Sequence, residues 1–306
     1  MLLAAASALW PGLGRAAEVA APAAVAAVPA DTAQDASGRD LDVPALAERL
    51  RSARYVLLGE IHDNAVQHRL RAALLRALLA DGRPSWVVFE QLDREHNAAV
   101  MAAPRDAEAL ITAGQLDRRA WGWPLHRPLF DAALAAGATV LGGNLSRADA
   151  SRVVRGGVAQ APADLQRWLA TEASAAAPLP AWTPAQEAAL RQQIDTGHCG
   201  ALPPALLAPM VWAQRARDAA LAATLVSAPA GARVVLIAGN GHVRRDTGVP
   251  HYLPVGPTEG IVSIGFLERG ADGARVSDGP YDEVWYTAPA ERPDPCAAWH
   301  APSAAQ

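Results

Sequence analysis

The chain has 306 residues, of which 51% are hydrophobic and 19% charged, so it can bury the core of one large domain or two small ones. The formal net charge is only -4, and no run of like charges occurs. Both features argue against nucleic acid and anionic membrane surfaces as partners, because both bind clustered positive charge. The two cysteines, Cys199 and Cys296, form no Cys-x-x-Cys pair, which excludes a structural zinc ribbon and leaves either one disulfide or two free thiols.

The first residues carry a short apolar segment. Residues 1–10 are mostly apolar, but a bilayer span needs about 20 such residues. Small residues near Ala17 suit signal cleavage, so residues 1–17 are predicted to be the end of a signal peptide. The protein is therefore predicted to be exported to the periplasm or cell envelope. No cysteine follows for lipid attachment. Residues 18–40 lack any helical period and are predicted to be a disordered linker, with a single domain over 41–288 and a flexible tail over 289–306.

Short apolar runs alternate with longer helical patterns through the predicted domain. The predicted strands are residues 55–59, 86–89, 139–141, 233–239, 261–267 and 283–287. A helix is predicted after the first strand, because Val66, Leu70, Leu74 and Leu78 share one face. Residues 146–226 are predicted to be a mostly helical insertion broken by prolines. Continuous apolar strands between helices predict an α/β fold with a central, mostly parallel sheet flanked by helices.

Polar side chains follow the predicted strands at the points where the strands end. Glu60 and His62 follow the first strand, Glu90 the second, Asn144 the third and His242 the fourth. In open parallel sheets, ligands bind at the carboxyl ends of the strands. We therefore expect these side chains, far apart in the sequence, to gather at one edge of the sheet.

Four of these residues have the chemistry of a metal site. Glu60 and His62 are two positions apart and point to the same side of an extended chain. Glu90 and His242 would complete a set of two nitrogen and two oxygen ligands, which suits zinc, manganese or iron. The alternative for each residue alone is ordinary: a hydrogen-bonded histidine in a loop, or a glutamate paired with one of the many arginines.

Two further groups have both a functional and a structural interpretation. Met210, Gln214 and Asp218 share one helical stripe; this stripe either faces a cleft or consists of a core methionine beside a surface pair, Arg217–Asp218. His126 lies among aromatic residues suited to flank a flat apolar ligand, and is otherwise a half-buried core histidine.

The remaining histidines have no predicted role. His68 and His96 are expected on solvent-facing sides of helices, and His251 and His300 are left unassigned. Neither a Gly-x-Ser-x-Gly elbow nor a Gly-x-Gly-x-x-Gly loop is present in the sequence, which disfavours serine hydrolysis and nucleotide binding.

The same motifs carry a family resemblance. They are Tyr55–Asn64 with its Gly-Glu-Ile-His, Phe89–Arg94, Gly142–Arg147, Gly197–Gly200, Gln214–Asp218, Ala238–Arg244 and Asp246–Pro250. In this order they resemble the ChaN family of bacterial haem-binding uptake proteins, which belongs with Tiki, TraB-like and erythromycin-esterase-like proteins. The resemblance implies an α/β domain that binds haem in iron acquisition, with two haems between two subunits. The chain departs from the family in lacking a lipid-attachment cysteine and in having His126 where the family often has tyrosine.

The resemblance suggests which residues bind the cofactor. The predicted cofactor-binding residues are His62, His126, Met210, Arg217, Arg244 and His242. His62 or His126 would ligate iron, and Arg217 and Arg244 would pair with the propionates, since guanidinium matches carboxylate geometry. Besides haem, the expected partners are a second subunit and an outer-membrane haem receptor.

A divalent-metal-dependent hydrolase, a peptidase or esterase like those of the Tiki branch, is the alternative. Glu60, His62 and His242 would hold zinc or manganese, and Glu90 would act as general base on a metal-bound water, with Asn144 and Asn240 beside the oxyanion. The aromatic segment around His126 favours haem, because a flat apolar ligand needs an apolar wall.

Overall fold

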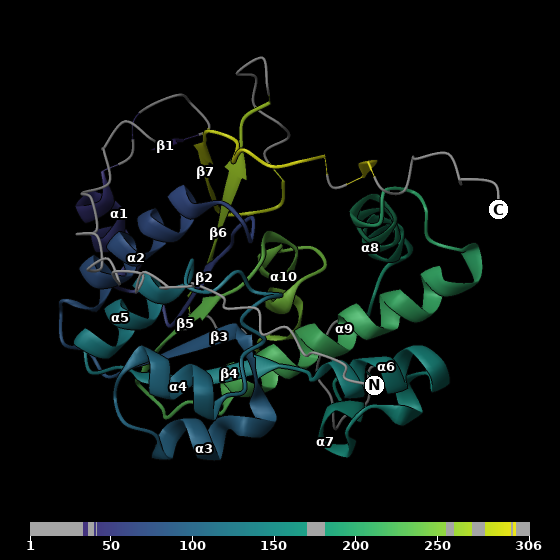
Figure 1. Ribbon diagram of the computed structural model, residues 1–306, viewed down its shortest axis with the longest axis horizontal. Helices are drawn as coiled ribbons and strands as arrows, with labels where there is room; N and C mark the ends of the chain where they lie inside the picture. Colours follow the sequence, from purple (N-terminus) through teal and green to yellow (C-terminus); the bar gives the residue numbers. More distant parts are fainter. Residues whose placement is uncertain are drawn as a thin grey trace, which may run out of the picture.

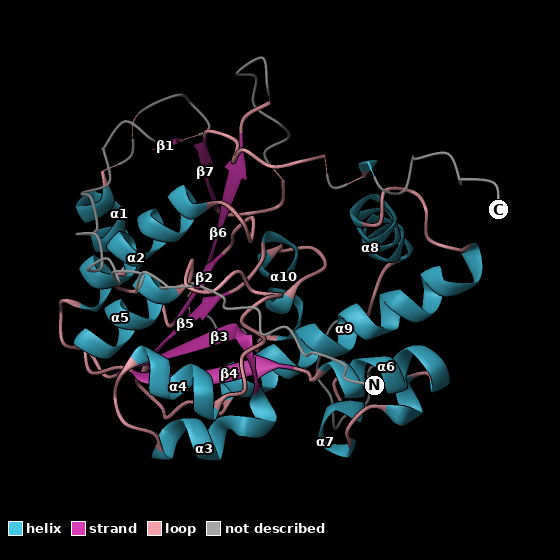
Figure 2. Ribbon diagram, in the orientation of Figure 1, coloured by secondary structure: helices cyan, strands magenta, loops and turns pink. Residues whose placement is uncertain are grey.

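A central sheet of seven strands organises the protein, seen here in a computed structural model (Figure 2). Residues 33–35, 40, 42–169, 181–254, 260–270, 279–294 and 296–297 are described. The strands are β1 Ala33–Gln34, β2 Tyr55–Leu58, β3 Ser85–Asp93, β4 Thr139–Asn144, β5 Arg233–Ile237, β6 Ile261–Glu268 and β7 Glu283–Thr287. Their order is β1-β7-β6-β2-β5-β3-β4. All neighbours run parallel except β1, which pairs antiparallel with β7, so the predicted α/β fold is confirmed.

Helices cover both faces of this sheet (Figure 1). They are α1 Val43–Leu50, α2 Ala65–Leu79, α3 Asn97–Ala102, α4 Ala107–Ala113, α5 Arg127–Ala135, α6 Arg147–Gly156, α7 Ala163–Gln166, α8 Pro184–Gly197, α9 Pro204–Val226 and α10 Asn240–Val243, with short 3-10 turns η2 Arg94–His96, η3 Val158–Gln160 and η4 Val249–Tyr252. Helices α1, α2 and α5 share one hydrophobic core, and α6, α7 and α9 share the other. Within the described residues, no helix is long and apolar enough to cross a membrane.

Burial on both sides explains the sequence of β2. Val56 and Leu58 pack into the core under α2, whereas Tyr55 and Leu57 pack into the core under α9. A strand with both faces covered needs apolar residues at every position, which gives a continuous apolar run rather than alternation. The following helix starts at Asn64, whose side chain accepts hydrogen bonds from two backbone N–H groups of its first turn.

Some element boundaries differ from those predicted. Strand β3 continues to Asp93, so Glu90 lies within the strand rather than after it. His242 lies on the short helix α10 rather than in a loop. In the predicted linker, Ala33–Gln34 forms β1 against β7, so disorder was the wrong prediction for this piece. The predicted signal segment, residues 1–17, and the rest of the linker apart from residues 35 and 40 lie outside the described residues.

The predicted helical insertion and tail are joined by a disulfide. Residues 146–226 form α6 to α9 as predicted, with 170–180 outside the described residues. Cys199, between α8 and α9, is bonded to Cys296, which decides between the two alternatives left open by the sequence. Arg292 also pairs with Glu268 and Asp63. The described part of the tail is therefore attached to the domain rather than free.

Candidate functional site

Three adjacent strands bring the site together. Strands β2, β5 and β3 are neighbours in the sheet, although β5 comes more than 140 residues after β3 in the chain. Their carboxyl ends deliver Glu60, Gly239 and Glu90 to one edge. The Gly239 backbone N–H donates to Oε2 of Glu90 at 2.7 Å. The prediction that strand ends from distant parts of the sequence become neighbours is correct. The order of the strands in the sheet brings them together.

Glu60 is the centre of the first cluster, which we name the Glu60 cluster: Glu60, His62, His68, Arg71 and His126. Oε1 of Glu60 lies 2.8 Å from Nδ1 of His62 and 2.9 Å from Nε2 of His126. Its Oε2 forms an ion pair with Arg71 and lies 3.2 Å from Nδ1 of His68. All members are buried except His62, whose side chain is 50% exposed.

The protonation states of this cluster follow from burial. Burial lowers the pKa of His68 to about 4 and, with help from His68 and Arg71, lowers the pKa of His126 far below its usual value, so both imidazoles are neutral at pH 7. Burial also lowers the pKa of Arg71, to about 9, against the opposing charge of Glu90. The guanidinium therefore stays charged at pH 7 and balances Glu60.

The Glu60 cluster fits a divalent cation poorly. Ligand atoms of Glu60, His68 and His126 lie within 4.8 Å of one another, but Arg71 already occupies the carboxylate. His68 is also satisfied at both nitrogens, by the carbonyl oxygen of His62 at 2.9 Å and by Arg71 at 2.9 Å. A metal ion there would face a buried positive charge at close range, which low dielectric makes costly.

A second cluster centres on His242. Its Nε2 lies 3.2 Å from Oε1 of Glu90, and its Nδ1 lies 2.6 Å from Oδ1 of Asp218 on α9. Burial opposes protonation of this imidazole, but the two carboxylates outweigh burial and raise the pKa of His242 to about 10. Although burial acts to raise the pKa of Glu90, the charge of His242 holds it well below its usual value; burial raises that of Asp218 to about 6. His242 is therefore an imidazolium held between two buried carboxylates.

The predicted set Glu60, His62, Glu90 and His242 is thus two pairs rather than one ligand sphere. Each pair is a hydrogen-bonded acid and imidazole, and the backbone of Gly239 lies between them. An added Cβ at Gly239 would lie 2.9 Å from Nε2 of His62 and 3.6 Å from Oε2 of Glu90. The four residues do converge, but His242 has both nitrogens committed to carboxylates and has none left for an ion.

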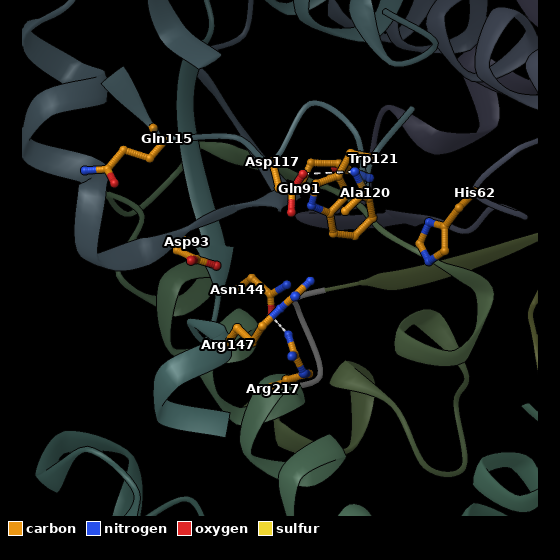
Figure 3. A pocket seen from close by; sticks show the side chains of 11 residues that line it. His62, Gln91, Asp93, Gln115, Asp117, Ala120, Trp121, Asn144, Arg147 and Arg217 are labelled. Carbon is orange, nitrogen blue, oxygen red and sulfur yellow. Dashed lines mark hydrogen bonds between the residues drawn. The ribbon is translucent and has the colours of Figure 1, made fainter. Parts of the chain in front are cut away.

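A cavity of about 520 Å³ opens beside these clusters (Figure 3). Its walls are His62, Gln91, Asp93, Gly114, Gln115, Asp117, Ala120, Trp121, Asn144, Arg147 and Arg217. In Figure 3, His62 lies on one side of the cavity and the arginines Arg147 and Arg217 lie on another. The ring of Trp121 stands edge-to-face with that of His62, with centroids 5.1 Å apart. The cavity thus combines an imidazole, an aromatic wall and a pair of cations.

Of the predicted cofactor residues, two line this cavity: His62 and Arg217. His126 is fully buried, is bonded to Glu60 and is not among the cavity-lining residues. Arg244 makes a bidentate pair with Asp246 at 2.9 and 2.8 Å. Neither Arg244 nor Met210 is among the cavity-lining residues.

The two asparagines predicted beside an oxyanion have other roles. The side chain of Asn240 donates to the carbonyl of Phe266 at 2.7 Å and accepts from its N–H at 3.1 Å, which joins α10 to β6. Asn144 lines the cavity, but its amide donates to the carbonyl of Glu90 and accepts from Arg217 at 2.9 Å. It therefore orients Arg217.

Sequence reasoning missed His68, which was expected to face solvent and is 1% exposed. A signal was present: His68, Arg71, Leu75 and Leu78 follow one another at the three- and four-residue spacing of a helix face, so His68 belongs to the buried stripe. Asp218, predicted as part of a stripe, is buried against His242 and is not half of a surface pair with Arg217.

Several solved structures are similar to this chain. ChaN of Campylobacter jejuni, described as binding haem cofacially, has a TM-score of 0.60 and 20% identity over 83% of this chain and 95% of that chain. The type III effector HopBA1 has a TM-score of 0.45 and 16% identity, covering 80% and 93% of the two chains. The erythromycin esterase EreC, in its open conformation, has a TM-score of 0.41 and 15% identity, covering 82% and 79%. A search of curated proteins found no significant match.

The family itself is established from the sequence match. Residues 46–253 match the family described as haem-binding uptake, Tiki superfamily, ChaN, which is more than half of the 306 residues. The matched region runs from α1 to the 3-10 turn η4 and includes both acid–imidazole clusters and every cavity-lining residue. The chain belongs to the ChaN family of haem-binding uptake proteins in the Tiki superfamily.

Proposed function

We propose that this protein binds haem in the cavity beside the Glu60 cluster and acts in haem or iron uptake. One observation carries the proposal: a single cavity offers an imidazole on one side and two guanidinium groups on another (Figure 3). Haem needs an axial ligand for its iron, apolar walls for its ring and cations for its propionates. When bound, haem would supply an iron centre that a protein side chain could ligate.

His62 fits the role of iron ligand. Its Nδ1 is hydrogen-bonded to Glu60 at 2.8 Å, and among the described residues its Nε2 has no hydrogen-bond partner. Metal-ligating histidines commonly use one ring nitrogen for the metal and give the other to a carboxylate, which fixes the tautomer. Half of the His62 side chain is exposed, so a ligand in the cavity can reach it.

The remaining walls fit the ring and its propionates. Trp121 offers an aromatic surface next to His62. Arg217 is held by Asn144 and by the carbonyl of Leu145, which leaves donors of its guanidinium for a carboxylate. Arg147 lines the same cavity. Asp93 is close to both arginines, and burial, followed by the charge of Glu95, raises its pKa.

Export and assembly are further parts of the proposal. A disulfide between Cys199 and Cys296 is typical of oxidising compartments, which supports a periplasmic or envelope location together with the apolar first residues. Cofacial haem binding in the Campylobacter jejuni protein supports a haem-linked homodimer. An outer-membrane haem receptor is the proposed donor.

A metal-dependent hydrolase is the second candidate. The observation in its favour is the grouping of Glu60, His68 and His126 within 4.8 Å. It is weaker than the haem proposal, because Arg71 neutralises Glu60 and because Glu90, the predicted general base, is already paired with His242.

Haemin titration followed by absorption tests the function. We expect a saturable Soret shift, together with less than stoichiometric divalent metal in the purified protein by elemental analysis. No saturable shift, with about one zinc or manganese per chain, would instead support the hydrolase.

Gly239→Ala is expected to lower haemin affinity about tenfold while the fold is retained. The added methyl would lie 2.9 Å from the ring of His62, so the half-exposed ring must move. The Gly239 backbone has a φ of -64°, which alanine adopts without strain. The matched control is Gly241→Ala, where an added Cβ would meet nothing within 4 Å. Equal haemin affinities in the two variants would contradict the placement of His62 at the iron.

A further inference from the structure

We propose, building on the haem-binding function above, that Glu60 is a positioning residue: it fixes the tautomer of His62 and biases bound haem iron toward the ferric state. Glu60 does not line the cavity. It would act only through the ring of His62, so its effect on haem differs from that of a residue in contact with the ligand.

The geometry fixes one tautomer. A carboxylate accepts hydrogen bonds and does not donate them when ionised, so the 2.8 Å contact from Nδ1 of His62 to Glu60 places the proton of a neutral ring on Nδ1. Nε2 then carries a lone pair, and it is the ring nitrogen near Gly239. The ring is thus held ready to donate an electron pair to iron.

The charge on Glu60 is secured by its surroundings. Its side chain is 0% exposed, so water does not screen it, and it forms a buried ion pair with Arg71. Gln91 donates to the same Oε1 at 3.2 Å. The orientation of the carboxylate is therefore set by the core, before any ligand binds.

A hydrogen-bonded carboxylate changes the electronic character of the ligand. It draws the Nδ1 proton toward itself and makes Nε2 more basic. A more basic axial ligand stabilises ferric over ferrous haem, which lowers the potential of the one-electron couple. Neutralising Glu60 should consequently favour the ferrous state.

His126 allows a second test, in which the reduction potential should shift in the opposite direction. Its Nε2 donates to the same Oε1, at 2.9 Å, and so competes with His62 for that oxygen. Removal of His126 should strengthen the remaining bond to His62. The two substitutions, Glu60→Gln and His126→Leu, should therefore move the potential in opposite directions, which a general loosening of the site would not do.

The main experiment is a reductive titration of the haem complexes of wild type, Glu60→Gln and His126→Leu, followed by absorption. In Glu60→Gln we expect the preference for ferric over ferrous haem to fall about tenfold, a positive shift of about 59 mV; in His126→Leu we expect a negative shift. The control is Glu95→Gln, which removes the same charge from a side chain that is 52% exposed and should leave the potential unchanged. No shift in Glu60→Gln, or shifts of the same sign in both variants, would overturn the proposal.

A measurement without haem separates this inference from the haem-binding function. Nitrogen-15 NMR of the apo protein should show His62 as the Nδ1–H tautomer, and a mixture of tautomers in Glu60→Gln. An Nε2–H tautomer in the wild type would overturn the role of Glu60, even if haem binds; failure of the wild type to bind haem would overturn the function instead. Glu60→Gln leaves Arg71 buried without its partner, so this variant could fail to fold. In that case the double variant Glu60→Gln/Arg71→Met, which removes both charges, is used instead. The same shifts are expected for it.

Discussion

Replacement of His62 by alanine is expected to lower the affinity for haemin at least about 100-fold, or about 3 kcal/mol. The substitution removes the imidazole that we propose as iron ligand. Nε2 of that ring has no other partner among the described residues, so the effect of the substitution on haemin binding would come from loss of the iron–nitrogen bond. Stability should change little, because half of the side chain is exposed. Absorption titration with haemin measures the affinity, and thermal unfolding checks the fold.

The matched control for His62→Ala is His96→Ala. His96 is a partly exposed histidine near the same edge that does not line the cavity. Its removal should leave haemin affinity within a factor of about two of the wild type. If His62→Ala retained wild-type affinity and the same Soret maximum, the axial ligand would be another group and the geometry proposed here would be wrong.

Replacement of His242 by glutamine is expected to have the largest effect on stability, a loss of about 3–5 kcal/mol at pH 7. The imidazolium lies between Glu90 and Asp218, and its removal leaves two buried carboxylates without a cation. Denaturant unfolding of the apo protein measures the free energy of unfolding. Haemin is not needed, because His242 does not line the cavity.

The same substitution predicts a pH dependence. The folded-state pKa of His242 is raised from 6.5 to about 10, so the folded protein keeps a proton that the unfolded chain loses above pH 6.5. The contribution of His242 to stability is therefore complete below about pH 6.5 and is lost as pH rises toward 10. The difference in unfolding free energy between wild type and His242→Gln should shrink over this window.

His96→Gln provides the control, since the side chain of His96 is 22% exposed and its partner Glu95 is 52% exposed, so water screens that pair. Its free energy of unfolding should follow that of the wild type across the same pH range. A difference between wild type and His242→Gln that is constant from pH 6.5 to 10 would show that His242 is not an imidazolium in the folded protein.

The sequence predicts strands well where burial is continuous. Residues 55–58 and 234–237 form continuous apolar runs because both faces of β2 and β5 are covered. Boundaries are less well predicted where a strand continues through polar residues: β3 runs on through Glu90 and Gln91 to Asp93. Those polar positions are buried because neighbouring strands and helices provide their partners, and local pattern does not contain that information.

The site shows the same division. Glu60, His62, Glu90 and His242 were identified from their places after apolar runs, and all four do meet. Their pairing was not predictable, because it depends on β5 lying between β2 and β3. When the strand order is not known, two glutamates and two histidines resemble a single metal site. In the folded chain, His242 pairs with Glu90 and Asp218, and Glu60 pairs with His62 and Arg71.

By itself the sequence determined the α/β fold, the family and the edge of the sheet at which the site lies, because apolar periodicity and motif order are local properties of the chain. Tertiary structure decided which charges neutralise one another. Arg71 and His68 face Glu60 only because α2 packs against the sheet, and His126 is buried because the aromatic segment before α5 closes over it. Pair energies depend on distance and burial, and both are set by packing between elements distant in sequence.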